Sequence, residues 1–192
     1  GKRMVKVREG MADQGSEDVI RFWFVEHGPD DWFAAKPEFD AILADRFSAT
    51  HAKVSAGEAW TWRATPEGRL AEILVLDQFS RQLFRGSPRA FAQDSMALAL
   101  AQEAVAAGHD GAIARERRKF LYMPYMHSES LVIHEEAMRL FTALGEEETL
   151  KYEVAHRDCL VRFGRYPRRN AALGRESTSE EKEYIASGSG MF

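Results

Sequence analysis

Cysteine is nearly absent from this sequence, since Cys159 is the single one among 192 residues. A lone thiol excludes an intramolecular disulfide and any zinc site built from several thiolates, so we expect a reducing compartment, most simply the cytoplasm. Long apolar runs are also missing, with no stretch of about eighteen such residues, and the polar start lacks the apolar core of a secretory signal. The sequence therefore predicts neither a membrane-spanning helix nor export.

The sequence also lacks an excess of either charge sign. It has 26 Lys and Arg against 30 Asp and Glu, which gives a formal net charge of -4. Such a chain has no overall attraction for polyanions, so we do not expect nucleic acid as a partner.

Familiar cofactor motifs are missing as well. There is no P-loop, no paired-glycine dinucleotide fingerprint and no HExxH helix, so the cofactor, if there is one, stays unknown. The side chains that offer metal ligands are His127, Glu129, His134 and His156. Arginines crowd the same segments and repel a cation, so we expect no metal site.

Helix start and stop signals recur along the chain, whereas no segment shows the alternation of a strand. Ser, Thr or Pro opens several segments, and Gly closes most of them. The helices expected from these signals lie at 16–28, 37–57, 65–85, 94–107, 128–145, 149–163 and from 177 onward. Short turns between them predict an all-α fold of antiparallel helical hairpins.

One domain is expected to cover residues 16–192. A chain of this size buries roughly 70% of its unfolded surface, and neither a repeat of fixed period nor a low-complexity linker divides it. Residues 1–15 are expected to be a flexible segment, part of it foreign to the natural protein, because the chain starts at Gly1 while Met4 and Met11 follow.

A polar stripe interrupts the apolar pattern of the helix expected at 65–85. At helical spacing, Asp77, Gln78, Arg81 and Arg85 continue the line of leucines that precedes them. Asp77 and Arg81 are four residues apart, so the carboxylate can orient that guanidinium while Arg85 stands free. The alternative is a solvated stripe with one surface ion pair.

The segment "FLYMPYMHSES" suggests a second polar feature. Pro124 disfavours helix at Met123, so His127 and Glu129 are expected in a loop that enters the next helix, where backbone amides favour an anion. His127 titrates near neutral pH and is a candidate acid or base. A histidine beside a helix start is, however, more often a structural hydrogen-bonding group.

The third feature is His156 with the arginine-rich segment that follows it. His156 lies on an apolar helix face and is either a core residue or a third catalytic candidate. The arginines and amide expected to bind a ligand after it are Arg162, Arg165, Arg169, Arg175 and Asn170. A guanidinium suits carboxylate and phosphate because its planar fork donates two parallel hydrogen bonds. The alternative is a basic surface loop balanced by nearby acids.

Taken together, "LDQFSRQLFRGSPRAFAQD", "FLYMPYMHSES" and "HRDCLVRFGRYPRRNAALGREST" resemble the bacterial family called domain of unknown function 924. The resemblance spans nearly the whole chain and implies a tetratricopeptide-like helical arrangement. It implies no activity. The family usually has "PHRN" where this chain has "PRRN", so Arg168 replaces a histidine that is therefore not a necessary catalytic base.

Three functions are consistent with these patterns. The leading hypothesis is a pocket that binds, and in an enzyme turns over, a small anionic molecule with a phosphate or carboxylate. The second is a scaffold whose concave face binds an acidic peptide or the carboxylate at a chain end. The third is a buried structural network in which acids such as Asp77 and Glu129 neutralise the arginines.

Overall fold

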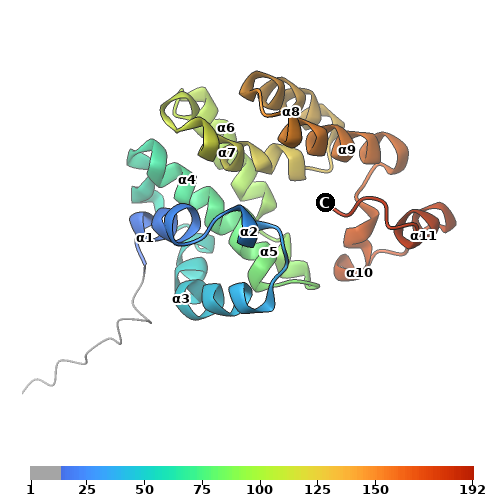
Figure 1. Cartoon of the computed structure of the whole chain (residues 1–192), viewed down its shortest axis with the longest axis horizontal. Coiled ribbons are helices and arrows are strands. Elements are labelled where there is room, and N and C mark those ends of the chain that lie inside the picture. Colours follow the sequence, from blue (N-terminus) through green and yellow to red (C-terminus); the bar gives the residue numbers. More distant parts are fainter. Residues whose placement is uncertain (1–13) are drawn as a thin grey trace, which may run out of the picture.

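The protein is described by a computed structural model that covers residues 14–192. Within this range the secondary structure is helical throughout and contains no strand, which confirms the predicted all-α fold (Figure 1). Most of the segment predicted to be flexible, residues 1–13, lies outside the described residues. No helix of the described part is long and apolar enough to cross a lipid bilayer.

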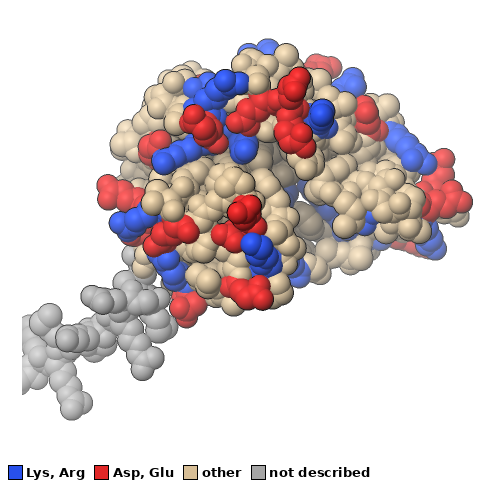
Figure 2. Space-filling model, viewed as in Figure 1, with Lys and Arg blue, Asp and Glu red and all other residues tan. Residues whose placement is uncertain are grey.

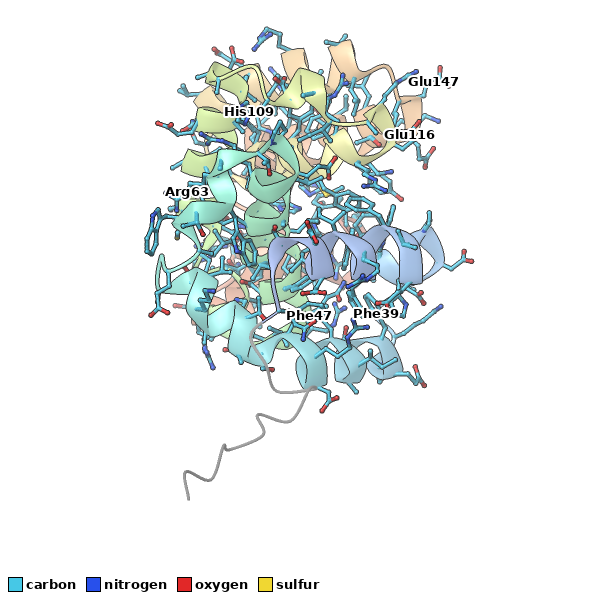
Figure 3. All side chains as sticks on the ribbon, turned by 90° about the vertical axis from the view of Figure 1, so that its left-hand side faces the viewer. Phe39, Phe47, Arg63, His109, Glu116 and Glu147 are labelled. Atoms are coloured by element: carbon cyan, nitrogen blue, oxygen red, sulfur yellow. The ribbon has the colours of Figure 1, made fainter. Side chains whose placement is uncertain are left out.

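The N-terminal helices form an aromatic-rich layer. Its elements are α1 (Ser16–Arg21), the π-helical turn η1 (Phe22–Glu26), α2 (Pro29–Trp32) and α3 (Pro37–Ser55). Phe39 and Phe47 point from α3 toward the α1–η1 segment (Figure 3), where their ring centroids lie 5.6 and 4.9 Å from that of Phe22. The tryptophan at the end of α2 is held in place because its indole N–H donates to the carbonyl of Trp23 at 2.8 Å.

A central helical segment packs against α1, α3, α6 and α7. After η2 (Trp60–Ala64), it consists of α4 (Pro66–Leu74), the π-helical turn η3 (Val75–Phe79) and α5 (Ser80–Leu83). Thr65 caps its start by accepting the N–H of Gly68, as the sequence predicts. The sequence predicts this segment as a single helix. In the structure its middle part, η3, is wound more loosely than an α-helix.

The C-terminal half forms consecutive packed helices followed by short elements. These are η4 (Pro88–Ala90), α6 (Asp94–Ala106), η5 (Asp110–Ala112), α7 (Arg115–His127), α8 (Leu131–Leu144), α9 (Glu147–Phe163), η6 (Pro167–Arg169), α10 (Asn170–Leu173) and α11 (Ser179–Ala186). Gly145 and Gly164 end α8 and α9 in the left-handed conformation that glycine adopts without strain. Beyond α9 the chain folds back, and its C-terminal end lies between the two halves of the molecule (Figure 1).

The prediction that Pro124 ends a helix was wrong. Pro124 lies inside α7, which continues to His127. Proline removes a backbone donor at a cost of about 3 kcal/mol in a helix interior. Six of its neighbours from Phe120 to Met126 are buried in the core, and this burial outweighs the cost of the proline.

Candidate functional site

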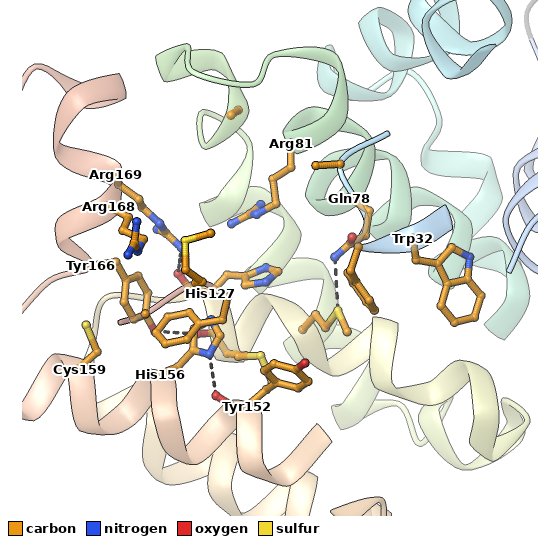
Figure 4. A pocket seen from close by; sticks show the side chains of 18 of the residues that line it. Trp32, Gln78, Arg81, His127, Tyr152, His156, Cys159, Tyr166, Arg168 and Arg169 are labelled. Carbon is orange, nitrogen blue, oxygen red and sulfur yellow. Dashed lines mark hydrogen bonds between the residues drawn. The ribbon is translucent and has the colours of Figure 1, made fainter. Parts of the chain in front are cut away.

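A cavity of about 1050 Å³ separates the central helical segment from α9 and the C-terminal elements. The space-filling view shows the hollow between these two parts, with acidic and basic side chains interspersed on the surrounding face (Figure 2). The close-up shows its polar side chains at one end, where Arg168, Arg169, His127 and His156 converge, and Trp32 at the other (Figure 4). The cavity, called the central cavity below, thus has a basic end and an aromatic end.

Two arginines from distant segments meet at the basic end. Arg81, on α5, donates to both carboxylate oxygens of Asp94 at 2.8 and 2.9 Å and also contacts Asp77 at 3.2 Å. Arg169, on η6, has its guanidinium 3.7 Å from the same Asp94 carboxylate. Arg81 therefore has two acids as partners. Arg169 lies near the Asp94 carboxylate, whose two oxygens already accept hydrogen bonds from Arg81.

Arg169 is held tightly although it has few polar partners. Its guanidinium lies between the rings of Phe91 and Tyr166, with centroid distances of 4.7 and 4.6 Å. Within residues 14–192, its one hydrogen bond is to the carbonyl of His127 at 2.8 Å. Burial and the neighbouring charge of Arg81 lower the pKa of Arg169, against the opposing effect of Asp94. The remaining donors of this guanidinium are available to an anion in the central cavity.

His127 is bound to a buried carboxylate. Its Nδ1 lies 2.6 Å from Oδ1 of Asp77, and the Asp77 side chain is 1% exposed. Burial alone raises the pKa of Asp77, but His127 and Arg81 outweigh it and lower that pKa. Burial, helped by the charge of Arg81, lowers the pKa of His127. The pair therefore consists of a carboxylate and a neutral imidazole at pH 7.

His156 also lines the central cavity. Its Nδ1 lies 2.6 Å from the carbonyl oxygen of Tyr152, which can only accept, so Nδ1 carries the proton in the neutral ring. Burial, with a contribution from His127, lowers the pKa of His156 to about 3. The two imidazole centroids are 6.2 Å apart.

Apolar side chains complete the central cavity. Trp32, Phe33, Met123, Met126 and Tyr152 line it together with Phe192. The ring of Phe192 lies 3.8 Å from that of His156, centroid to centroid. Gln78 lies among these groups, and its amide donates to Asp77 at 3.0 Å and to the sulfur of Met123 at 3.3 Å. The lining is thus largely aromatic and thioether, with polar groups at defined positions.

A second cavity of about 280 Å³ adjoins the His127–Arg169 contact. Both residues line the two cavities, and Ser95, Ser128 and Glu129 line the smaller one. His127 therefore borders both cavities.

Several predicted site residues lie outside the central cavity and form a network with acids. Arg175 donates to both oxygens of Glu129 at 2.9 and 3.1 Å, and Glu129 also accepts the Tyr166 N–H at 2.7 Å. Arg165 binds both oxygens of Glu181 at 2.9 and 2.8 Å. These bonds fix the segment that carries Arg169.

Three further predicted residues also have partners in the protein. Asn170 is buried and accepts from Arg175 at 2.9 Å. Arg162 is exposed and its guanidinium lies over the ring of Phe163 at 4.6 Å. The expectation that Arg85 stands free was wrong, because Asp40 binds it at 2.6 and 3.1 Å, although Arg85 does line the central cavity.

A buried hydrogen-bonded group supports the floor of the site. The hydroxyl of Tyr166 donates to the carbonyl of Met126 at 2.7 Å, and His134 lies 2.9 Å from the same hydroxyl. His134 also contacts Glu153 at 2.7 Å, and both side chains are fully buried. Both ring nitrogens of His134 have hydrogen-bond partners, so this residue of α8 connects Glu153 on α9 with Tyr166, which directly precedes η6.

Sequence reasoning missed several cavity residues. Arg168 lines the central cavity and donates to the carbonyls of Ser189 and Ile185. Trp32 and Phe91 line it too, although nothing in their local sequence distinguishes them from packing residues. Arg168 lies next to Arg169 in "YPRRN", and its positive charge is the feature of the sequence that could have identified it. Among the described residues, no group of three or more His, Cys, Asp or Glu is placed to hold a metal ion.

The fold and the cavity define an all-α protein with a basic, histidine-containing pocket between its two halves. The family model described as "Bacterial protein of unknown function (DUF924)" matches residues 19–189, so the chain belongs to this family, which confirms the resemblance. A solved structure, of the protein of unknown function ATU0120 from Agrobacterium tumefaciens, is 39% identical, with a TM-score of 0.86 over 90% of this chain and 97% of that one. A search of curated proteins finds no match.

Proposed function

We propose that the central cavity binds a small organic anion, with its carboxylate or phosphate at Arg169 and its apolar body toward Trp32. The observation that carries this proposal is the state of Arg169, whose side chain is 13% exposed. Among the residues that the structure describes, its guanidinium makes one hydrogen bond, to a carbonyl, and the nearest carboxylate is 3.7 Å away. A buried charge without a full set of partners is costly, and an anion removes that cost.

The shape and lining of the cavity support an organic rather than an inorganic anion. Pockets for small molecules are mostly apolar with a few polar groups that fix orientation. Here the aromatic end lies opposite the guanidinium end (Figure 4). The acids Glu146, Glu147 and Glu148 also line the cavity, so charge repulsion favours the basic end for the anionic group.

The arginines outside the cavity support a structural role instead. Arg165 and Arg175 each have a carboxylate bound at two positions, which leaves them little capacity for a ligand. In this proposal they position η6, and Arg169 with Arg168 contacts the anion. No observation favours a long peptide groove.

The test is a thermal-shift titration with phenyl phosphate and phenylacetate, compared with inorganic phosphate and neutral benzyl alcohol. A ligand at about 100 times its dissociation constant stabilises the folded state by about 2.7 kcal/mol. We expect the two aromatic anions to raise the melting temperature most, and Arg169→Gln to abolish the difference. Arg139→Gln is the control, because Arg139 is paired with Glu136 on the surface. Equal shifts with the neutral compound would contradict anion recognition.

A further inference from the structure

We propose that the central cavity is catalytic and hydrolyses an ester bond of its organic anion, with His127 as the general base that activates water and Asp77 as the residue that orients it. This inference rests on the proposed anion binding and adds a reaction to it. It begins from the contact between the two side chains, Nδ1 to Oδ1 at 2.6 Å.

The contact fixes which nitrogen of His127 is basic. An ionised carboxylate only accepts hydrogen bonds, so Nδ1 of His127 carries the proton and Nε2 keeps its lone pair. Asp77 lies behind the ring, almost fully buried, and His127 lines the central cavity between Arg81 and His156 (Figure 4). A carboxylate that holds the imidazole in this tautomer is the arrangement that general-base histidines require.

Other histidines show that this arrangement is specific to the cavity. His134 also meets a carboxylate, but Ser128 and Tyr166 occupy its second nitrogen and the ring is fully buried. His27 pairs with Asp31 at 2.9 Å outside the central cavity. His127 combines a carboxylate behind the ring with a cavity in front of it.

The charges that face His127 keep it neutral at pH 7. They come from every element packed around it: Asp77 on η3, Arg81 on α5, Asp94 on α6, His156 on α9 and Arg169 on η6. Burial and Arg81 disfavour the imidazolium more than the two aspartates favour it, so the pKa of His127 lies below its usual value. A neutral imidazole is able to accept a proton, which a charged one cannot do.

A positive charge lies beside the base. Arg169 donates to the backbone carbonyl of His127 at 2.8 Å, so the anion-binding guanidinium is fixed to the residue that carries the base. An ester whose anionic group is bound at Arg169 is therefore held close to this base, and such positioning makes the attack effectively intramolecular.

Water is the nucleophile that fits this site. Within the described residues, the ring nitrogens of His127 have no Ser, Thr or Cys side chain as a hydrogen-bond partner. The thiol of Cys159 also lines the cavity, but burial raises its pKa and its Sγ points to the Arg165 carbonyl at 3.8 Å. The smaller cavity, which His127 also lines, provides space for water.

The step is balanced without a co-reactant. Nε2 of His127 takes a proton from water while the water oxygen bonds to the acyl carbon, and the electron pair of the carbonyl bond moves onto its oxygen. The bond from the acyl carbon to the alcohol oxygen then breaks, and the Nε2 proton passes to that oxygen. A carboxylic acid and an alcohol leave, and the imidazole is neutral again.

The test uses mono(4-nitrophenyl) glutarate, an activated ester with a free carboxylate, and 4-nitrophenyl butyrate as its neutral counterpart. We expect faster turnover of the anionic ester and a rate that rises with pH to a plateau as His127 loses its proton. His127→Gln and Asp77→Asn should each lower kcat at least 100-fold, in the range expected for a general base. His27→Gln, which removes the histidine of the other aspartate pair, should leave kcat unchanged.

A second measurement needs no substrate and no variant. The 15N imidazole signals of the intact protein should show His127 neutral at pH 7, protonated at Nδ1 and unprotonated at Nε2. The opposite tautomer or a charged ring would overturn the proposal, as would a His127→Gln variant within twofold of the wild type. An anionic ester that shifts the melting temperature without turnover refutes the catalytic inference alone. If neither esters nor aromatic anions shift it, the proposed anion binding itself fails.

Discussion

Arg169 lies 3.7 Å from the carboxylate of Asp94, too far for a hydrogen bond, because Arg81 already takes both oxygens of that carboxylate. One acid thus serves two guanidinium groups from segments 88 residues apart in the chain (169 − 81). The net charge at the basic end of the cavity therefore depends on how the Asp94 carboxylate is divided between Arg81 and Arg169.

Arg169→Lys keeps the positive charge and removes the planar fork. If Arg169 binds the anion, this variant should weaken phenyl phosphate binding by roughly 1–3 kcal/mol, the range for a charged hydrogen bond, with a nearly unchanged melting temperature. Calorimetric titration and thermal unfolding of the same sample give both quantities. A large loss of stability with unchanged affinity would assign Arg169 to the structural network instead.

Asp94→Asn removes the shared counter-charge. We expect the free energy of unfolding to fall by about 1–3 kcal/mol, since Arg81 loses its bidentate partner. Affinity for phenyl phosphate should rise at the same time, because a carboxylate no longer competes with the ligand for Arg169. Urea unfolding and the same titration measure the two effects. Unchanged or weaker binding would show that Asp94 does not compete with the anion.

Glu129→Gln tests the structural part of the network. Glu129 accepts two bonds from Arg175 and one from the Tyr166 backbone, so the variant should lose about 1–3 kcal/mol of unfolding free energy with no direct loss of an anion contact. Glu136→Gln is the matched control, because its pair with Arg139 is exposed and screened by solvent, so its loss should change the free energy of unfolding little. Equal losses in the two variants would contradict the structural role of Glu129.

His156 makes stability depend on pH. Its folded-state pKa of about 3 lies below the unfolded value of 6.5, so between these values the unfolded state binds more protons. The free energy of unfolding therefore falls as the pH is lowered from 6.5 toward 3, by up to about 1.4 kcal/mol per pH unit for this group. His156→Gln should show a shallower slope between pH 5 and 6.5 and an equal slope between pH 7 and 8. Equal slopes below pH 6.5 would show that His156 is not held neutral.

Local signals predicted most of the helices. Pro37 and Thr65 begin α3 and α4 as expected, and Gly145 follows α8 in a left-handed conformation. At the start of α11, in the stretch where a helix is expected from 177 onward, Thr178 and Glu181 form a capping box. These signals act over a few residues, so the sequence pattern contains them in full.

Pairings between distant residues could not be predicted in the same way. The sequence suggested Asp77 as the partner of Arg81, and the structure shows that contact at 3.2 Å, but Asp94 binds Arg81 more closely. Arg85 finds Asp40, which is 45 positions away. From the sequence alone, any of several acids could be the ion-pair partner of a given arginine. The packing of the helices determines which acid lies close to it. The solvated alternative for the polar stripe fails for the same reason, since Asp77 is buried by elements far along the chain.

The loosely wound turn Val75–Phe79 lies between α4 and α5 in the central segment. It contains the extra residue that a π-type turn accommodates, so a deletion of one residue there would restore ordinary α-helical winding. The five residues of this π-type turn rotate the chain about the axis by nearly as much as four α-helical residues at roughly 100° each, so such a deletion would leave both Leu74 and Arg81 facing as they do now. The turn is therefore an insertion that the central segment tolerates. A homologous chain without the extra residue would keep Arg81 at the cavity and would lack one side chain of Val75–Phe79, the stretch that carries Asp77 and Gln78.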